Sequence, residues 1–167
     1  IAEVIETPQV IPIMGDREKI NVVAIPYSRD KKYVLNGLKK LKSEVESKNS
    51  VLLMHCGVTG GTVGSGMYIM SDEYSLGELM YDKWKYVVLG HYHQPQFLAH
   101  NTIYCGTPVQ NTFNDELPDD SVWEGYNGFF VLDTQNDNIV KLYKEDVCGG
   151  IIFVPVTSVP RFITVKS

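Results

Sequence analysis

The stretch "KYVVLGHYHQPQ", residues 85–96, carries an apolar run into a glycine and two histidines one residue apart. Short continuous apolar runs of this kind are typical of strands that are buried on both faces of a sheet. His91 and His93 therefore follow the carboxyl end of a predicted strand. In open α/β sheets, binding loops gather at such ends, so we expect both histidines at the rim of a sheet.

A second apolar run, "SVLLMHCG" at residues 50–57, also ends in a histidine, His55. Imidazole is the commonest neutral metal ligand in proteins. One interpretation is that His55, His91 and His93 only satisfy local hydrogen bonds at strand ends. Because three of the four histidines fall at such ends, we favour a metal site for Mn, Fe or Zn, which imidazole suits.

Two neighbours of these histidines are interpreted differently. His100, in "FLAHNT", is expected to be an exposed turn residue. Cys56 directly follows His55, and successive residues of a strand point to opposite faces. We therefore expect Cys56 in the core rather than among metal ligands.

The remaining pattern predicts one helix among many strands. Val34, Leu38, Leu41 and Val45 recur at helical spacing, which predicts an amphipathic helix over residues 31–48. A short helix is expected near residues 76–80, and a hairpin turn around Gly15-Asp16. The other expected strands are at residues 2–6, 9–14, 20–27, 101–106, 128–133, 138–143 and 150–156. This order predicts an α/β fold, a layered β-sandwich flanked by helices, in a single domain over residues 1–167.

Composition limits the class of protein. The chain has 167 residues, 44% of them hydrophobic, and a net charge of −5, which gives no overall basic signature for nucleic-acid binding. It contains no apolar stretch of the ~20 residues that span a membrane, and its start resembles no signal peptide. The three cysteines are widely spaced, which favours reduced thiols and a cytoplasmic protein. The first residue is not Met, so we expect a processed, split or excised chain.

Several motifs together resemble one family. They are His55 at a strand end, the Gly-His-x-His of residues 90–93, the "YCGTP" of residues 104–108, and the Gly-Phe at residues 128–129. This series is similar to the second half of a calcineurin-like metallophosphoesterase domain, most similar to the SbcD-type DNA repair exonucleases. The stretch "INVVAIPY" also resembles the strand that precedes the family's helix.

The resemblance implies a calcineurin-like fold and a two-metal site. His55 and His91 would bind one Mn²⁺ and His93 its neighbour. The metal pair would clamp a phosphodiester and activate the attacking water, which makes the protein a hydrolase of DNA ends. The implied partners are DNA and an SbcC-like coiled-coil ATPase, and the implied processes are DNA repair and recombination.

The first half of the family's site is absent from the sequence. The Asp-x-His, Gly-Asp-x-x-Asp and Gly-Asn-His elements do not occur; "MGDRE" contains only Gly15-Asp16 and lacks the second aspartate. No catalytic residue can therefore be assigned. We expect the isolated chain to bind Mn²⁺ weakly and to be inactive until the missing N-terminal half is supplied, from the parent chain or from a second polypeptide.

Two other functions remain open. The chain could belong to another calcineurin-like phosphodiesterase that acts on a nucleotide or a small phosphoester. It could also be a non-catalytic partner-binding module with a remnant metal site. Among the other features, Tyr92 is the tyrosine expected to reach a substrate. The glycine-rich residues 57–66 are equally compatible with a flap and with a tolerant surface loop. The acidic residues 114–124 could steer cations, but we favour a solvated loop.

Overall fold

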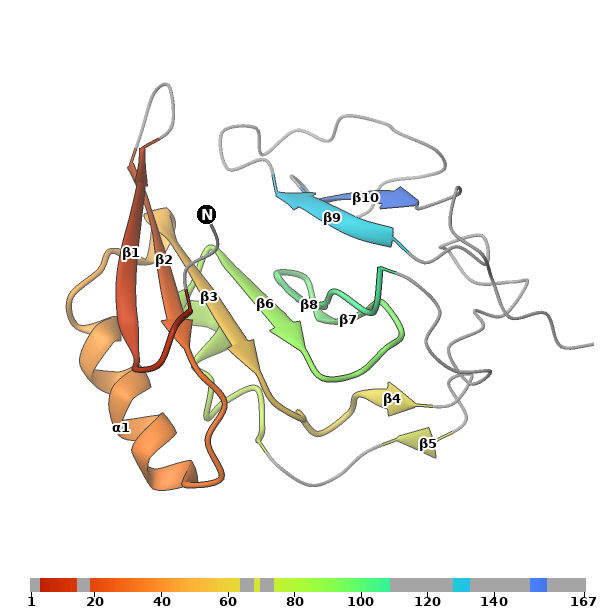
Figure 1. The fold of residues 1–167 in the computed structure, drawn as a ribbon, viewed down its shortest axis with the longest axis horizontal. Coiled ribbons are helices and arrows are strands. Elements are labelled where there is room, and N and C mark those ends of the chain that lie inside the picture. The colour runs from red at the N-terminus through yellow and green to blue at the C-terminus, as the bar shows by residue number, and fades with distance from the viewer. Residues whose placement is uncertain are drawn as a thin grey trace, which may run out of the picture.

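A six-stranded mixed sheet forms the centre of the protein in a computed structural model (Figure 1). The structure describes residues 4–14, 19–63, 68–69, 74–108, 128–132 and 151–155. The strands of the sheet, in spatial order, are β1 (Gln9–Met14), β2 (Lys19–Ile25), β3 (Ser50–His55), β6 (Tyr86–Gly90), β8 (Thr102–Tyr104) and β7 (Gln96–Ala99). Two small antiparallel sheets pair β4 (Thr62–Val63) with β5 (Tyr68–Ile69), and β9 (Gly128–Leu132) with β10 (Ile151–Pro155).

The four central strands are parallel, and the two edge strands are antiparallel to their neighbours. Parallel neighbours need a crossover connection, and α1 (Lys31–Lys42) supplies one between β2 and β3. The carboxyl ends of β2, β3, β6 and β8 therefore meet at one edge of the sheet. The predicted α/β class is confirmed in this form, a mixed sheet with few helices.

Helix α1 is shorter than its hydrophobic pattern predicts. Its amino end is capped by the Asp30 carboxylate, which accepts a hydrogen bond from the Tyr33 backbone N–H at 3.0 Å. The helix ends at Lys42, six residues before the predicted Lys48, where the Ser43 hydroxyl donates back to the Lys40 carbonyl at 2.6 Å. A serine that bonds the preceding turn in this way competes with the next helical hydrogen bond. The prediction was therefore wrong at this end.

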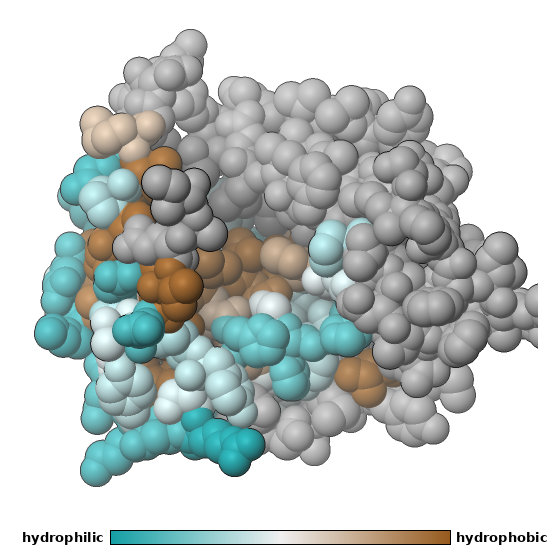
Figure 2. All heavy atoms as spheres, in the orientation of Figure 1, coloured by the Kyte–Doolittle hydropathy of each residue, from teal (hydrophilic) through white to brown (hydrophobic). Residues whose placement is uncertain are grey.

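The core lies between α1 and one face of the sheet. Val34, Leu38 and Leu41 of the helix are buried in one cluster with Leu52 and Leu89 of the central strands. The opposite face carries a smaller cluster built on Ile20, Val51, Tyr86 and Ile103. Figure 2 shows hydrophobic residues gathered where Figure 1 draws β2, β3 and β6.

Other expectations have mixed outcomes. The hairpin of β1 and β2 is confirmed by its antiparallel register, although its turn lies outside the described residues. Residues 4–6 form no strand, and Val4 is largely exposed. Alternating apolar residues predict a strand only where a neighbouring strand can pair with them. Residues 76–80 form turns in place of the expected helix. A 3₁₀ helix, η2 (Tyr81–Lys83), follows them, and a second 3₁₀ helix, η1 (Ser47–Asn49), precedes β3. The strand expected at residues 138–143 and the acidic loop at 114–124 lie outside the described residues.

No helix in the described part of the chain is a candidate to cross a membrane. None combines the length and the apolar content that crossing a bilayer requires. The helix α1 has 12 residues, against the roughly 20 that a span needs.

Two adjacent leucines of β3 test this arrangement of faces. Leu52 is fully buried against α1, whereas Leu53 on the other face is 44% exposed. Leu52→Ala should therefore lower the free energy of unfolding by about 2–5 kcal/mol, as cavities in cores do. Leu53→Ala, the matched control, should lower it by less than about 1 kcal/mol, in line with its partial burial. Urea unfolding of both variants measures the difference, and equal losses would contradict the assignment of faces.

Candidate metal-binding edge

The predicted histidines lie at the carboxyl edge of the parallel strands. His55 is the last residue of β3, and Gly90, which precedes His91, is the last residue of β6. The two strands are neighbours, and their register places His55 directly beside Gly90. Both histidines are exposed at this edge, as is His93 two residues further on. The expectation that strand-end histidines meet at one rim is confirmed for His55 and His91.

The imidazoles of His55 and His91 are in contact. Their ring centroids lie 5.4 Å apart, with the ring planes at 82°. In metal sites an imidazole nitrogen lies about 2.0–2.1 Å from a zinc ion. A centroid separation of this size suits two rings that direct one nitrogen each to a common ion. The pair therefore fits part of a metal site.

A row of aromatic rings supports the two imidazoles from both sides. Tyr27 lies 6.2 Å from His55, centroid to centroid, and is 58% exposed. Tyr92 lies 5.0 Å from His91 and, on its other side, 4.7 Å from the fully buried Tyr104. The row thus runs from solvent at Tyr27 to the core at Tyr104. Ring contacts of this kind restrict how far the imidazoles can turn.

The hydroxyl of Tyr104 fixes the chain that follows His55. It donates a hydrogen bond of 2.8 Å to the Cys56 carbonyl, across 48 residues of sequence. The Cys56 backbone N–H donates in turn to the Gly90 carbonyl at 3.3 Å. The two strand ends that carry the histidines are therefore tied together beyond the last pair of the ladder. Neither bond was expected from sequence, where Tyr104 entered only as part of a motif.

Glycine at position 90 is required by the position of the His55 ring. A β-carbon built on Gly90 would lie 2.9 Å from Nδ1 of His55 and 3.7 Å from its Cε1. The first distance is shorter than side chains accept without movement. Any larger residue at position 90 would therefore displace the imidazole of His55 from its place at the edge.

His91 has a strained backbone. Its φ is +122°, in a region that favours glycine, and His91 is one of two non-glycine residues with positive φ among the described residues. Such conformations cost about 1–3 kcal/mol and cluster at functional sites, where the surrounding structure maintains them. The strain is consistent with a functional role for this imidazole, because its position is kept at a cost in local stability.

The loop after the histidines is anchored by backbone and side-chain bonds. The Thr107 N–H donates to the His93 carbonyl at 2.9 Å, just after Gly106, whose φ of +70° suits glycine. The Gln96 amide both accepts from the Thr62 N–H at 2.7 Å and donates to the Thr62 carbonyl at 2.9 Å. The described part of the glycine-rich segment is therefore attached to the start of β7, directly after the loop of residues 91–95 that carries His91 and His93. No pattern in the sequence predicted this role of Gln96.

Tyr92 corrects one expectation. It was predicted to reach a substrate, but its side chain is only 5% exposed, and its ring packs over Gly61 and Tyr104. The flanking residues of the loop point outward, so the intervening side chain turns into the core. Tyr92 therefore supports the imidazole of His91 from within.

Neither Cys56 nor Cys105, the two cysteines in the described part of the chain, joins the two imidazoles in a ligand group. Cys56 is buried on the face away from His55, as predicted. Burial raises the pKa of the Cys105 thiol, which disfavours the thiolate form that metals bind. His100 is an exposed turn residue, also as predicted.

The donor set at the edge is incomplete within the described residues. No three His, Cys, Asp or Glu side chains in that part of the chain come together in a group that could hold a metal. The structure thus brings His55 and His91 together. The role of His93 stays a prediction.

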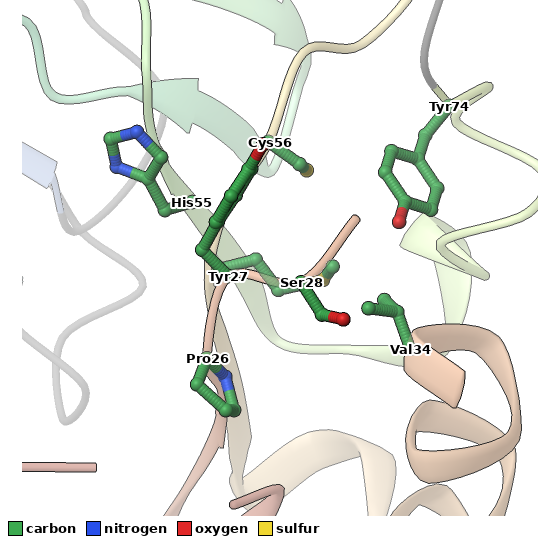
Figure 3. Close-up of a pocket in the computed structure, with 8 residues that line it drawn as sticks. Pro26, Tyr27, Ser28, Val34, His55, Cys56 and Tyr74 are labelled. Atoms are coloured by element: carbon green, nitrogen blue, oxygen red, sulfur yellow. The ribbon is translucent and has the colours of Figure 1, made fainter. Parts of the chain in front are cut away.

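A shallow pocket opens on the other side of His55. Figure 3 shows Tyr27 between the His55 ring and the side of the pocket formed by Val34 and Tyr74. Its empty volume is about 210 Å³, which includes open solvent. Most of this volume is open solvent, and the enclosed space is only about 10 Å³, far below the roughly 300–1,000 Å³ of small-molecule pockets. The pocket therefore gives no separate small-molecule site.

Paired substitutions at His91 and His93 test the strain. At position 91 the glycine variant should be more stable than the alanine variant by about 1 kcal/mol or more, because only glycine relieves the positive φ. At His93, whose φ is not positive, alanine should be the more stable of the two. Chemical denaturation of the four variants measures the order, and a His91→Ala variant at least as stable as His91→Gly would contradict a strained His91.

The chain was also compared with known proteins. No family model matches it, and none of the curated proteins gives a significant match.

Proposed function

We propose that this chain is the histidine-rich half of a calcineurin-like metallophosphoesterase domain, similar to the SbcD-type exonucleases that hydrolyse DNA ends. The observation that carries the proposal is the contact between His55 and His91. They end neighbouring parallel strands, and their rings lie 5.4 Å apart at an exposed edge. The resemblance assigns these two residues to a common Mn²⁺.

The structure supports this proposal through the surroundings of the imidazoles. Gly90 leaves room for the His55 ring, and Tyr92, the residue after the strained His91, packs on Tyr104 in the core. Rigid supports of this kind position ligands before a metal binds. If His55 and His91 served only local hydrogen bonds, nothing would offset the energetic cost of the strained backbone at His91.

The proposed roles of this half are to bind and orient. His55 and His91 would hold one Mn²⁺, and His93 would reach toward the second. When bound, a metal pair of this type neutralises phosphate charge and lowers the pKa of a bound water. The bridging carboxylate, the Asn ligand and the acid for the leaving group would come from the missing N-terminal half. The layered sandwich of the complete domain, the SbcC-like ATPase partner and the cytoplasmic location belong to the same proposal.

A second candidate is a partner-binding module with a remnant site. The incomplete donor set within the described residues favours it, because a module that no longer hydrolyses phosphodiesters needs no full set of ligands. The two candidates differ in whether added ligands restore hydrolysis. A phosphodiesterase acting on nucleotides would differ in substrate alone.

A complementation experiment tests the proposal. The isolated chain should show no Mn²⁺-dependent hydrolysis of linear duplex DNA, because the bridging carboxylate is absent. Fusion to, or mixing with, a polypeptide that supplies the Asp-x-His, Gly-Asp-x-x-Asp and Gly-Asn-His elements should produce hydrolysis. In that assembly His91→Ala should reduce the rate of hydrolysis by at least about 100-fold, because even the outer partners of metal ligands cost about 10–100-fold when mutated. His100→Ala, the control, should leave the rate unchanged.

Two results would contradict the proposal. One is vigorous hydrolysis by the pure chain that His91→Ala abolishes, since the chain would then hold a complete site. The other is a correctly folded assembly that binds Mn²⁺ through the supplied elements but does not depend on His91. Release of acid-soluble nucleotides measures both, and release of phosphate from a nucleoside monoester distinguishes the small-substrate alternative.

A further inference from the structure

Helix α1 carries a concentration of positive charge that the rest of the chain lacks. Its twelve residues, "KKYVLNGLKKLK", include five lysines and no carboxylate. The whole chain has a net charge of −5. This helix is therefore a local basic element on an acidic protein. Local patches can govern association even where the net charge is unfavourable.

Two of these lysines are engaged within the fold. Lys31 pairs with Glu78 at 2.8 Å, an interaction that lowers the pKa of the Glu78 carboxyl. The Lys42 ammonium donates to the Val45 carbonyl at 3.1 Å and lies 5.2 Å from the centre of the Trp84 ring. Their charges are partly satisfied within the protein. The candidates for binding a ligand are the other three lysines of the helix.

Lys32, Lys39 and Lys40 are exposed, and no ion pair in the described part of the chain engages them. With Arg29, which is also exposed and precedes the helix, they form what we call the basic stripe. Lys32 and Lys39 are seven residues apart, which is close to two helical turns, so they share one side of α1. The buried residues of the helix, such as Leu38 and Leu41, lie on the opposite side.

The spacing of the stripe suits an extended polyanion. Seven residues of helix rise about 10.5 Å. One strand of duplex DNA carries a phosphate about every 3.4 Å along its axis, so the distance from Lys32 to Lys39 corresponds to about three phosphates. Compact anions would engage a single lysine, whereas a repeating phosphate backbone engages several.

The stripe begins beside the histidine edge. Arg29 follows Tyr27 by two residues, and the Tyr27 ring is 58% exposed and lies 6.2 Å from the His55 ring. In Figure 1 the loop from β2 leads directly into α1 at the end of the sheet where β3 ends. Because α1 covers the core face of the sheet and His55 points to the other face, a strand lying along α1 would pass round the carboxyl edge at Tyr27 to reach the imidazoles.

We propose that the basic stripe binds the phosphate backbone of duplex DNA and leads its end past Tyr27 to His55 and His91. The identification of the polyanion as DNA rests on the proposed function. The binding itself depends on lysine charge and requires no metal. It can therefore be measured separately from hydrolysis.

The test uses fluorescence anisotropy of a short labelled duplex with the full chain in EDTA, over a range of salt concentrations. Removing two phosphate contacts by Lys32→Gln with Lys39→Gln should flatten the slope of log affinity against log salt by about 1.8. The matched control, Lys19→Gln with Lys48→Gln, removes two exposed lysines near the amino ends of β2 and β3. The control should leave the slope unchanged, and thermal unfolding shows whether both double variants remain folded.

The outcomes separate the two proposals. A flattened slope in the stripe variant alone supports the stripe, whether or not the chain binds Mn²⁺. Equal losses in both double variants would overturn it, because attraction would then be general and not local. Absence of duplex binding by the unaltered chain would overturn it too. Stripe binding together with failed complementation would leave a DNA-binding surface and remove the nuclease.

Discussion

The contact between His55 and Gly90 across the parallel strands β3 and β6 is the constraint on which the candidate site depends. The register places the two residues side by side, and the missing side chain at Gly90 leaves space for the His55 imidazole. The next residue, His91, then takes a positive φ and brings its ring against that of His55. A shift of register by one residue would turn His55 to the core face and separate the pair.

The supports of this contact come from distant parts of the chain. Tyr104, at the end of β8, bonds the carbonyl that follows His55 and packs under Tyr92. Gln96, at the start of β7, ties the histidine loop to Thr62. Antiparallel pairing of β7 with β8 places Gln96 opposite Tyr104, and parallel pairing of β6 with β8 brings Tyr104 beside Leu89. These contacts connect the edge to β7 and β8, and in our proposal the basic stripe on α1 gives it an approach for a charged substrate.

The sequence predicted the strands that carry the histidines because their apolar runs are continuous and end in glycine or histidine. It also predicted the opposite faces of His55 and Cys56, since alternation along a strand is a fixed geometric property. The helix end at Lys42 was not predictable from periodicity, because a single serine hydrogen bond ends the helix while the apolar spacing continues to Val45. The burial of Tyr92 was missed for a similar reason, since it depends on the long-range partners Gly61 and Tyr104.

The central claim is that His55 and His91 bind one ion together. Mn²⁺ affinity measured for the unaltered chain, His55→Ala, His91→Ala and the double variant gives a coupling energy between the two residues. If both imidazoles hold the same ion, the double variant should bind scarcely more weakly than either single variant. If the two losses are additive, or neither substitution changes the affinity, the histidines do not share an ion and the account is contradicted.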